Sequence, residues 1–475
     1  MNIKLLKQEA PCRWRMEKYG PMRVDGLFFG NKDIILELDE TTVSQVRDVA
    51  SLPGVVGPVC AMPDAHSGYG FPIGGVGAFD EKHGVISAGG VGFDISCGVR
   101  TLTTGLKKQD LITCDAKLAD LIFQRIPSGA GVGGDIILEG DQLDEMLIGG
   151  ASWAVGQGFG KPEDLGRIEG HGKSLLAAPS KVPLKAKQRM RNQMGSLGSG
   201  NHYLEVQYIE EIYDADKAAA FDIEVDDVVV SIHCGSRGLG HQIAKEYLPM
   251  MADKALEFGI ILPHKDIACA PISSELGQDY LGAMGAGINC ALANRQVIAH
   301  LVRECFAEIL PQADLKLLYD VSHNTCQREI YKVNDKNKKL WVHRKGATRA
   351  LGPNHPELPR EFKKHGQPVI IGGSMGTASY ILAGTKQAAE ISFSSCCHGA
   401  GRVMSRSKAR KSFKGNKIQK ELSRSGITIR SGSIRGIAEE APLAYKCVDM
   451  IIESTQLAGI AEKVARLRPI LCIKG

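Results

Sequence analysis

The sequence predicts an α+β fold in which mixed β-sheets are surrounded by helices and the active site lies at strand ends. Short apolar segments bounded by Gly, Ser or Asn, such as 227–232 and 315–321, are typical of buried strands. A longer apolar stretch at 281–310 predicts a core helix. No Pro/Ser-rich or charged linker divides the 475 residues, so we expect one large domain spanning residues 1–475.

The remaining elements follow from apolar spacing and from breaker residues. Further strands are expected at 85–88, from 202 onwards, and at 369–371, and further helices at 42–50, 109–126, 181–194 and 402–424. Residues 62–77 and 89–98 are rich in Gly and predict two ordered functional loops. The Gly-rich stretch 127–175 predicts an insertion of short helices and loops.

Composition excludes several classes of protein. The chain is 43% hydrophobic and 23% charged, and its net charge of +5 permits a nucleic-acid partner without requiring one. It contains neither the apolar core of a signal peptide nor an apolar run of membrane-spanning length, so we expect no membrane association. The 13 cysteines are scattered and odd in number, which predicts a reduced, cytoplasmic protein with packed or metal-binding thiols.

Five side chains form a candidate metal site. His202, His233 and His323 each fall at a predicted strand end, where α/β sites tend to form, and Asp94 and Cys97 lie in a tight Gly-rich loop. This mixed N/O/S set suits Zn²⁺, Mn²⁺ or Fe²⁺. Five ligands exceed the needs of one tetrahedral ion, and a thiolate can bridge two cations, so we expect two ions that clamp a phosphoryl displacement.

His398 is the candidate nucleophile. It lies between Cys397 and a Gly-Ala-Gly turn, which lets backbone N–H groups approach a phosphate closely. Neutral imidazole is a competent nucleophile near physiological pH. The chain lacks an in-register P-loop at 166–174, and Arg23 replaces the lysine of a Lys-x-Asp-Gly motif, so the common nucleotide-activating motifs are missing.

Eight motifs in order resemble the RtcB family of RNA-splicing ligases. They are MPDAHSGYGFPIGG (62–75), GGVGFDISCGVR (89–100), GSGNHYLEV (198–206), HCGSRGLG (233–240), SHNT (322–325), GGSMGTASY (372–380), CHGAGR (397–402) and CIKG (472–475). The resemblance runs over nearly the whole chain and retains each ligand position of the family pattern. It implies joining of RNA ends bearing a 2′,3′-cyclic phosphate or a 3′-phosphate to 5′-hydroxyl ends, with GTP as co-substrate.

The same resemblance implies the roles of individual residues. His398 would be guanylylated by GTP, one Mn²⁺ would bind Asp94, Cys97 and His202, and a second would bind Cys97, His233 and His323. Tyr445 would stack on guanine, while Glu205 and Lys474 would bind its polar groups. The whole implied nucleotide pocket comprises Asn201, His202, Tyr203, Leu204, Glu205, His323, Asn324, Gly372, Gly373, Ser374, Met375, Ser379, His398, Gly399, Ala400, Gly401, Tyr445 and Lys474.

The partner expected from the resemblance is RNA, as tRNA halves or broken RNA, with archease as a possible activator and a monomer as the expected state. The arginines expected to grip RNA are Arg189, Arg191, Arg237, Arg402 and Arg406. The basic stretch 408–424 fits a solvated face and an RNA track equally well. Two alternatives stay open: a dinuclear-metal phosphatase or cyclic phosphodiesterase, and an RNA-binding protein without catalysis.

Overall fold

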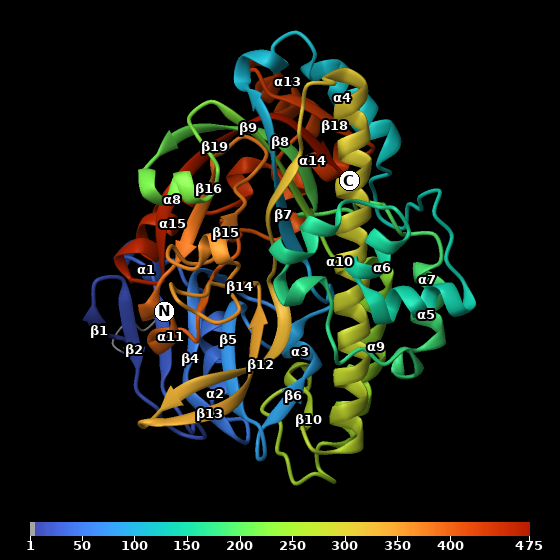
Figure 1. Ribbon diagram of the computed structural model, residues 1–475. Coiled ribbons are helices and arrows are strands. Elements are labelled where there is room, and N and C mark those ends of the chain that lie inside the picture. The colour runs from blue at the N-terminus through green and yellow to red at the C-terminus, as the bar shows by residue number, and fades with distance from the viewer. Residues whose placement is uncertain (1–4) are drawn as a thin grey trace.

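Two large β-sheets and a covering of helices frame the molecule, as Figure 1 shows for the computed structural model, which describes residues 5–475. The first sheet has the order β1 (Lys7–Ala10), β2 (Arg13–Met16), β3 (Gly26–Phe29), β4 (Val55–His66), β5 (Ile73–Asp80), β13 (Lys336–Lys345) and β12 (Asn324–Val333). The second has the order β11 (Lys316–Ser322), β7 (Gly98–Lys107), β9 (Asp227–Cys234), β8 (Tyr203–Ile212), β19 (Ala461–Lys474), β16 (Ser379–Gly384) and β15 (Pro368–Ile371), with β18 (Thr428–Ser431) beside β19. Both mix parallel and antiparallel pairs, which confirms the predicted α+β class.

Two short ribbons and fifteen α-helices complete the described chain. The ribbons pair β10 (Cys269–Pro271) with β6 (Val85–Ser87), and β14 (Ala347–Arg349) with β17 (Ser395–Cys397). The helices are α1 (Lys32–Leu36), α2 (Glu40–Ala50), α3 (Ala88–Val91), α4 (Asp115–Arg125), α5 (Gly140–Gly149), α6 (Ala151–Gly156), α7 (Leu184–Met190), α8 (Ala215–Ala220), α9 (Arg237–Lys254), α10 (Glu275–Ile309), α11 (Lys386–Ile391), α12 (Arg406–Ser412), α13 (Gly415–Arg424), α14 (Ile434–Glu439) and α15 (Val448–Leu457). Within residues 5–475, each helix is too short or too polar to span a bilayer.

The second sheet curls until its first strand, β11, lies against its last, β15. Alternation along a strand sends successive side chains to opposite faces. On β9, Val228 and Val230 therefore join the main core, whereas Val229 faces an inner core shared with strands across the curl. His233 has the same parity as Val229, so the curl directs this histidine toward the inside of the sheet at its rim.

The long helix α10 closes the outer face of the second sheet. Its 35 residues give a length of about 52 Å at 1.5 Å per residue, and it runs beside β7 and α9 for much of the height of the molecule (Figure 1). Most of its residues are buried, as the apolar stretch 281–310 predicts. Short helices α5 and α6, from the Gly-rich stretch 127–175, pack against it.

The prediction that 62–77 is one long loop is wrong, because β4 extends to His66 and β5 begins at Ile73. Pairing between these strands shifts register between Ala61 and His66, so Pro63 and Asp64 lie in an irregular part of β4 that needs no regular ladder bonds. Gly74 meets the backbone of Ala65 so closely that a side chain would not fit. Glycine thus serves close strand packing here.

Two predicted helices have different limits in the structure. The stretch 402–424 forms two helices, α12 and α13, because Phe413 is extended and Gly415 packs against the carbonyl of Ile434. The stretch 109–126 contains a 3₁₀ turn, Lys108–Leu111, before α4 begins at Asp115. The strand prediction for 85–88 holds to Ser87, whose side chain then accepts a hydrogen bond from Gly90 and caps α3.

Candidate active site

Strand register brings the predicted metal ligands to one rim of the second sheet. Gly98, which follows Cys97, pairs with Ser322 on one side and with Cys234 on the other. His233 itself pairs with Tyr203, the first residue of β8. His202 and His323 flank those paired residues in the chain, so four ligands meet without a long connection.

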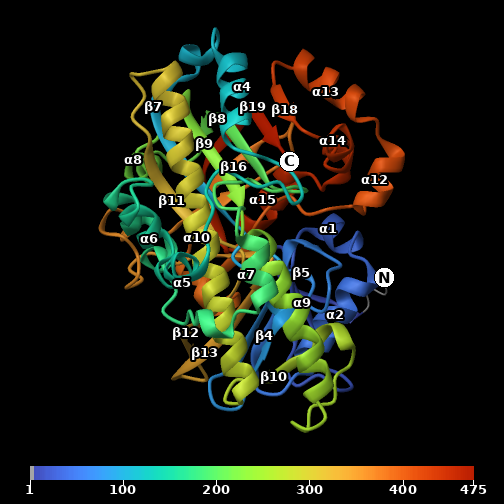
Figure 2. The same cartoon turned by 90° about the vertical axis from the view of Figure 1, so that its right-hand side faces the viewer.

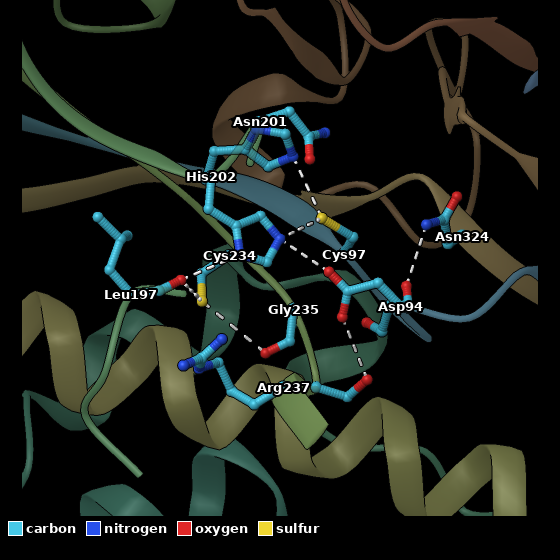
Figure 3. A network of polar contacts seen from close by, with 12 residues as sticks. Asp94, Cys97, Leu197, Asn201, His202, Cys234, Gly235, Arg237 and Asn324 are labelled. Atoms are coloured by element: carbon cyan, nitrogen blue, oxygen red, sulfur yellow. Dashed lines mark hydrogen bonds and ion pairs between the residues drawn. The ribbon is translucent and has the colours of Figure 1, made fainter. Parts of the chain in front are cut away.

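Two groups of ligand atoms lie close enough to hold metal ions, and both contain Cys97. One group is Asp94, Cys97 and His202, the other is Cys97, His233 and His323, and the ligand atoms within each lie within 4.8 Å of one another. The Cys97 Sγ lies 3.3 Å from Nε2 of His202 and 3.2 Å from Nε2 of His233. Figure 3 shows the first of these contacts, with the His202 ring also 2.8 Å from Oδ2 of Asp94.

The chemistry of these donors fits a metal. Nε2 of His233 and Nε2 of His323 face each other at 3.2 Å in a buried position. Burial lowers the pKa of both imidazoles well below its usual value, so both carry a lone pair rather than a charge. Nδ1 of His202 lies 3.0 Å from the carbonyl of Leu197, so Nδ1 donates there and Nε2 faces the other ligands (Figure 3). Burial disfavours the charged form of His202, but Cys97 and Asp94 raise its pKa well above the usual value, so a bound metal would have to displace a proton from Nε2.

Removing a proton from Cys97 completes each donor set. Burial, aided by the Asp94 carboxylate and opposed by His202, raises the pKa of this thiol to about 12. A bound cation would favour the thiolate, as cysteine ligands are deprotonated by the metal they bind. The donor set of three imidazoles, one carboxylate and one thiolate therefore fits two ions that share a sulfur.

A buried arginine fixes the three ligand loops from behind. Nη1 of Arg295 on α10 donates to the carbonyls of Ser96 and Cys234, at 2.7 and 2.8 Å. Its Nη2 lies 3.2 Å from Oγ of Ser322. These residues adjoin Cys97, His233 and His323 in the chain, and Asp320 neutralises the guanidinium at 2.9 Å. One side chain thus sets the spacing of three ligands.

His398 faces this cluster from the short ribbon β14–β17. Its ring centroid lies 4.8 Å from that of His323. The Oδ2 of Asp64 lies 2.7 Å from Nδ1 of His398 and also accepts the backbone N–H groups of His398 and Gly399. Burial raises the pKa of Asp64, but His398 more than offsets this, so the net pKa is below its usual value. An ionised Asp64 favours a proton on Nδ1, which leaves Nε2 as the nucleophilic atom.

A cavity of about 660 Å³ adjoins both His398 and the metal cluster, a volume typical of ligand pockets. Many of the predicted nucleotide residues line it. These are Asn201, Tyr203, Glu205, His323, Asn324, Gly372, Gly373, Ser374, Met375, His398, Gly399, Ala400, Gly401, Tyr445 and Lys474. Asp94, Cys97 and His233 line it too, so the cavity and the metal cluster form one site.

Three predicted nucleotide residues do not line this cavity. His202 lies behind it, among the metal ligands. Leu204 has the opposite strand parity to Tyr203 and Glu205 and joins the main core. The Oγ of Ser379 accepts the backbone N–H of Gly373 at 3.1 Å, so this serine supports the loop 372–375 from behind.

The predicted RNA-binding arginines have different surroundings. Arg402 and Arg406 line the cavity, and Glu440 pairs with both guanidinium groups at 3.2 and 3.1 Å. Arg237 donates to Oγ of Ser196 and to the carbonyls of Gly129 and Val132.

Arg189 lies on α7 and donates to Gln242, and Arg191 pairs with Glu139 on the surface.

The sequence-based prediction gives no role to Asp64, Lys345 or Glu440. Asp64 contacts His398, Lys345 lines the cavity, and Glu440 accepts the hydroxyl of Tyr445. Burial lowers the pKa of Lys345 to about 7, as expected for a lysine enclosed with little compensation. The position of Asp64 beside His66 within the first motif is a signal that could have indicated a functional role.

Comparison with known proteins identifies the family. A profile described as tRNA-splicing ligase RtcB matches residues 45–475. The chain belongs to the RtcB family. It is 46% identical to the tRNA-splicing ligase RtcB of Archaeoglobus fulgidus, with 100% of each chain covered. It is 46% identical to that of Thermococcus kodakarensis, with 99% of each covered, and 47% identical to that of Methanococcus maripaludis, over 96% and 95% of the two chains.

The shared sulfur gives a prediction for this RtcB chain. Cys97→Ser should lower occupancy at both metal positions, because the substituted sulfur belongs to both groups, whereas His202→Ala should affect mainly one. Mn²⁺ titration calorimetry with metal analysis of the dialysed protein measures both. Cys305→Ser, a change at a buried thiol on α10, is the matched control. Normal two-ion occupancy in Cys97→Ser would refute the shared sulfur.

Proposed function

We propose that this RNA ligase uses GTP and Mn²⁺ to join RNA ends bearing a 2′,3′-cyclic phosphate or a 3′-phosphate to 5′-hydroxyl ends, as in tRNA splicing or RNA repair. One observation carries the proposal: His398 lies beside the metal cluster, has its Nδ1 turned to Asp64, and opens onto a nucleotide-sized cavity. Membership of the RtcB family supports the ligase chemistry.

Asp94, Cys97 and His202 would hold one Mn²⁺, and Cys97, His233 and His323 the other. When bound, the ions would neutralise negative charge that develops on phosphate oxygens. Lys345 and Lys474, which also line the cavity, would add cationic donors for the phosphates.

The first step forms a bond between Nε2 of His398 and the α-phosphorus of GTP, and pyrophosphate leaves. Asp64 stabilises the charge that this bond places on the imidazole, since its carboxylate adjoins Nδ1. An oxygen of the RNA 3′-phosphate then attacks the same phosphorus, which frees His398 and gives an RNA–pp–G end. The 5′-hydroxyl oxygen finally attacks the 3′-phosphate, loses its proton and releases GMP. A 2′,3′-cyclic phosphate must first be opened by water.

Guanine recognition is assigned to the end of the cavity around Tyr445. This ring is stacked by Arg402 at 4.8 Å and hydrogen-bonded through its hydroxyl to Glu440, so it forms a fixed aromatic surface. Glu205 is buried on β8, and Nζ of Lys474 donates to the carbonyls of Gly200 and His202. A carboxylate suits the N–H donors of guanine, and an ammonium suits its carbonyl oxygen.

The site is built from a single chain, and this supports a monomer as the working form.

The alternative of a dinuclear phosphatase or cyclic phosphodiesterase explains the metal cluster equally well. It gives no role to His398, Asp64 or the Tyr445 end of the cavity, and the ligase uses all three.

Covalent labelling separates the two. Incubation with α-labelled GTP and Mn²⁺, without RNA, should leave an acid-labile label on the wild-type protein and none on His398→Ala, because the phosphoramidate needs this imidazole. Gel autoradiography measures the label. His241→Ala, at a histidine on α9, is the control and should label fully. Undiminished label on His398→Ala would refute the nucleophile, and an unlabelled wild type would favour the phosphatase.

Glu205 makes nucleotide affinity depend on pH. Burial raises the pKa of its carboxyl to about 7, with Lys474 opposing the rise. Only the ionised form can accept guanine N–H groups with both oxygens, so GTP affinity should fall as pH falls through 7, by about tenfold from pH 8 to pH 6. Calorimetric titration of GTP at these pH values measures the change. Glu205→Gln keeps the titration of the nucleotide itself but should lose this extra dependence, and an identical pH profile in both proteins would contradict the role.

A further inference from the structure

Positive charge is concentrated in one segment beside the active site. Residues 402–435 contain eleven Lys or Arg residues and one acidic residue, Glu421, although the whole chain has a net charge of only +5. The segment forms α12 and α13, which Figure 2 shows with α14 together at one side of the molecule. We define the basic ridge as the exposed basic residues of α12, α13 and their connection that make no ion pair, namely Lys408, Lys411, Lys414, Lys420 and Arg424. Lys417 and Arg435 are exposed too but lie 3.7 Å from Glu421 and 3.9 Å from Glu439.

The ridge lacks the ion pairs found on the cavity side of the same segment. There, Glu440 pairs with Arg402 and Arg406, and Glu439 pairs with Arg410. Within residues 5–475, by contrast, none of the ridge residues has a carboxylate within ion-pair distance. The two glutamates therefore neutralise the arginines nearest the cavity and leave the outer charges available to a polyanion.

The underside of the ridge anchors it to the nucleotide pocket. Ile418 and Leu422 of α13 share a buried cluster with Met375 and Tyr203, both of which line the cavity. This packing gives the two helices a fixed position relative to His398. Surface helices commonly pack an apolar face on the core, so this packing shows that the charged face is held in a fixed position and does not by itself assign a ligand to it.

The chain also connects the ridge to the catalytic histidine. Every residue from His398 to Arg406 lines the cavity, and α12 begins at Arg406. A polymer whose end lies at His398 would reach the ridge by leaving the cavity along this segment. We propose that the basic ridge binds the phosphate backbone of the RNA strand that extends from the reacting end. This inference rests on the proposed function for the identity of the polymer.

The pattern favours RNA over an acidic protein. Lysine ammonium groups on exposed helix faces contact phosphates as point charges and do not require a particular base sequence. A substrate that varies in sequence but always carries a regular line of phosphates matches that chemistry. The ridge would add affinity in proportion to RNA length, since an RNA confined to the cavity would not reach it.

Fluorescence anisotropy with 3′-phosphate RNA tests the ridge in the full-length protein. We compare RNAs of about four and about 16 nucleotides, without GTP so that no ligation occurs. Lys411→Ala/Lys414→Ala/Lys420→Ala should weaken binding of the long RNA by about 10- to 100-fold and lower the salt dependence, as log K against log[salt], by about 2. Binding of the short RNA should change by less than about twofold.

Two further variants serve as controls. Lys336→Ala/Lys338→Ala/Lys339→Ala removes the same charge from β13, at the opposite end of the molecule (Figure 1), and should bind both RNAs normally. The triple Lys→Arg variant of the ridge should restore long-RNA binding and excludes a folding defect. Wild-type affinity of the ridge Ala variant for long RNA, or an equal loss in the β13 variant, would overturn the proposal; the first result would leave an acidic protein as the partner. GTP labelling is measured without RNA, so it tests the proposed ligase function independently of the ridge. A protein that labels with GTP but whose ridge variant binds long RNA normally would refute the ridge alone.

Discussion

The site depends on one buried sulfur that belongs to two ligand groups. The Cys97 Sγ is within 3.3 Å of both His202 and His233, so neither group is complete without it. Three imidazoles packed around a thiol gain little from one another without a cation. Arg295 of α10, paired with Asp320, donates hydrogen bonds to the loops that carry the ligands, and these bonds fix the ligand positions relative to the helix. The rest of the site is arranged around this centre.

His398, the proposed nucleophile, is also held in place by neighbouring side chains. Its ring is tilted by 52° against the ring of His323 on one side and contacts Asp64 on the other, so its orientation comes from two different sheets. The irregular pairing of β4 places Asp64 there, and the ribbon β14–β17 places His398. Held in this way, His398 would need little reorganisation before the attack proposed above, and such positioning is a large part of what a protein contributes to phosphoryl transfer.

The sequence predicts the fold class and the residue types of the site well, for physical reasons. Apolar strands such as 227–232 are recognisable because burial on both faces leaves no polar alternation, and histidines at their ends converge because neighbouring strands share a rim. Asp64 escapes prediction because Gly and Pro around it suggest a loop, whereas the structure uses them for close strand packing. Leu204 is predicted to line the pocket but is buried in the core, since a motif does not reveal which side of a strand each residue faces. Glu440 is distant in sequence from every motif, and only tertiary packing brings it to Tyr445.

The central claim is that two cations share Cys97 while His398 carries the guanylate. Diffraction at the manganese edge, from crystals grown with Mn²⁺ and GTP, tests it most directly. We predict two anomalous peaks, one on each side of Sγ of Cys97, and continuous density between Nε2 of His398 and a phosphorus atom. A single peak away from this sulfur, or an unmodified His398 turned from the cluster, would contradict the account.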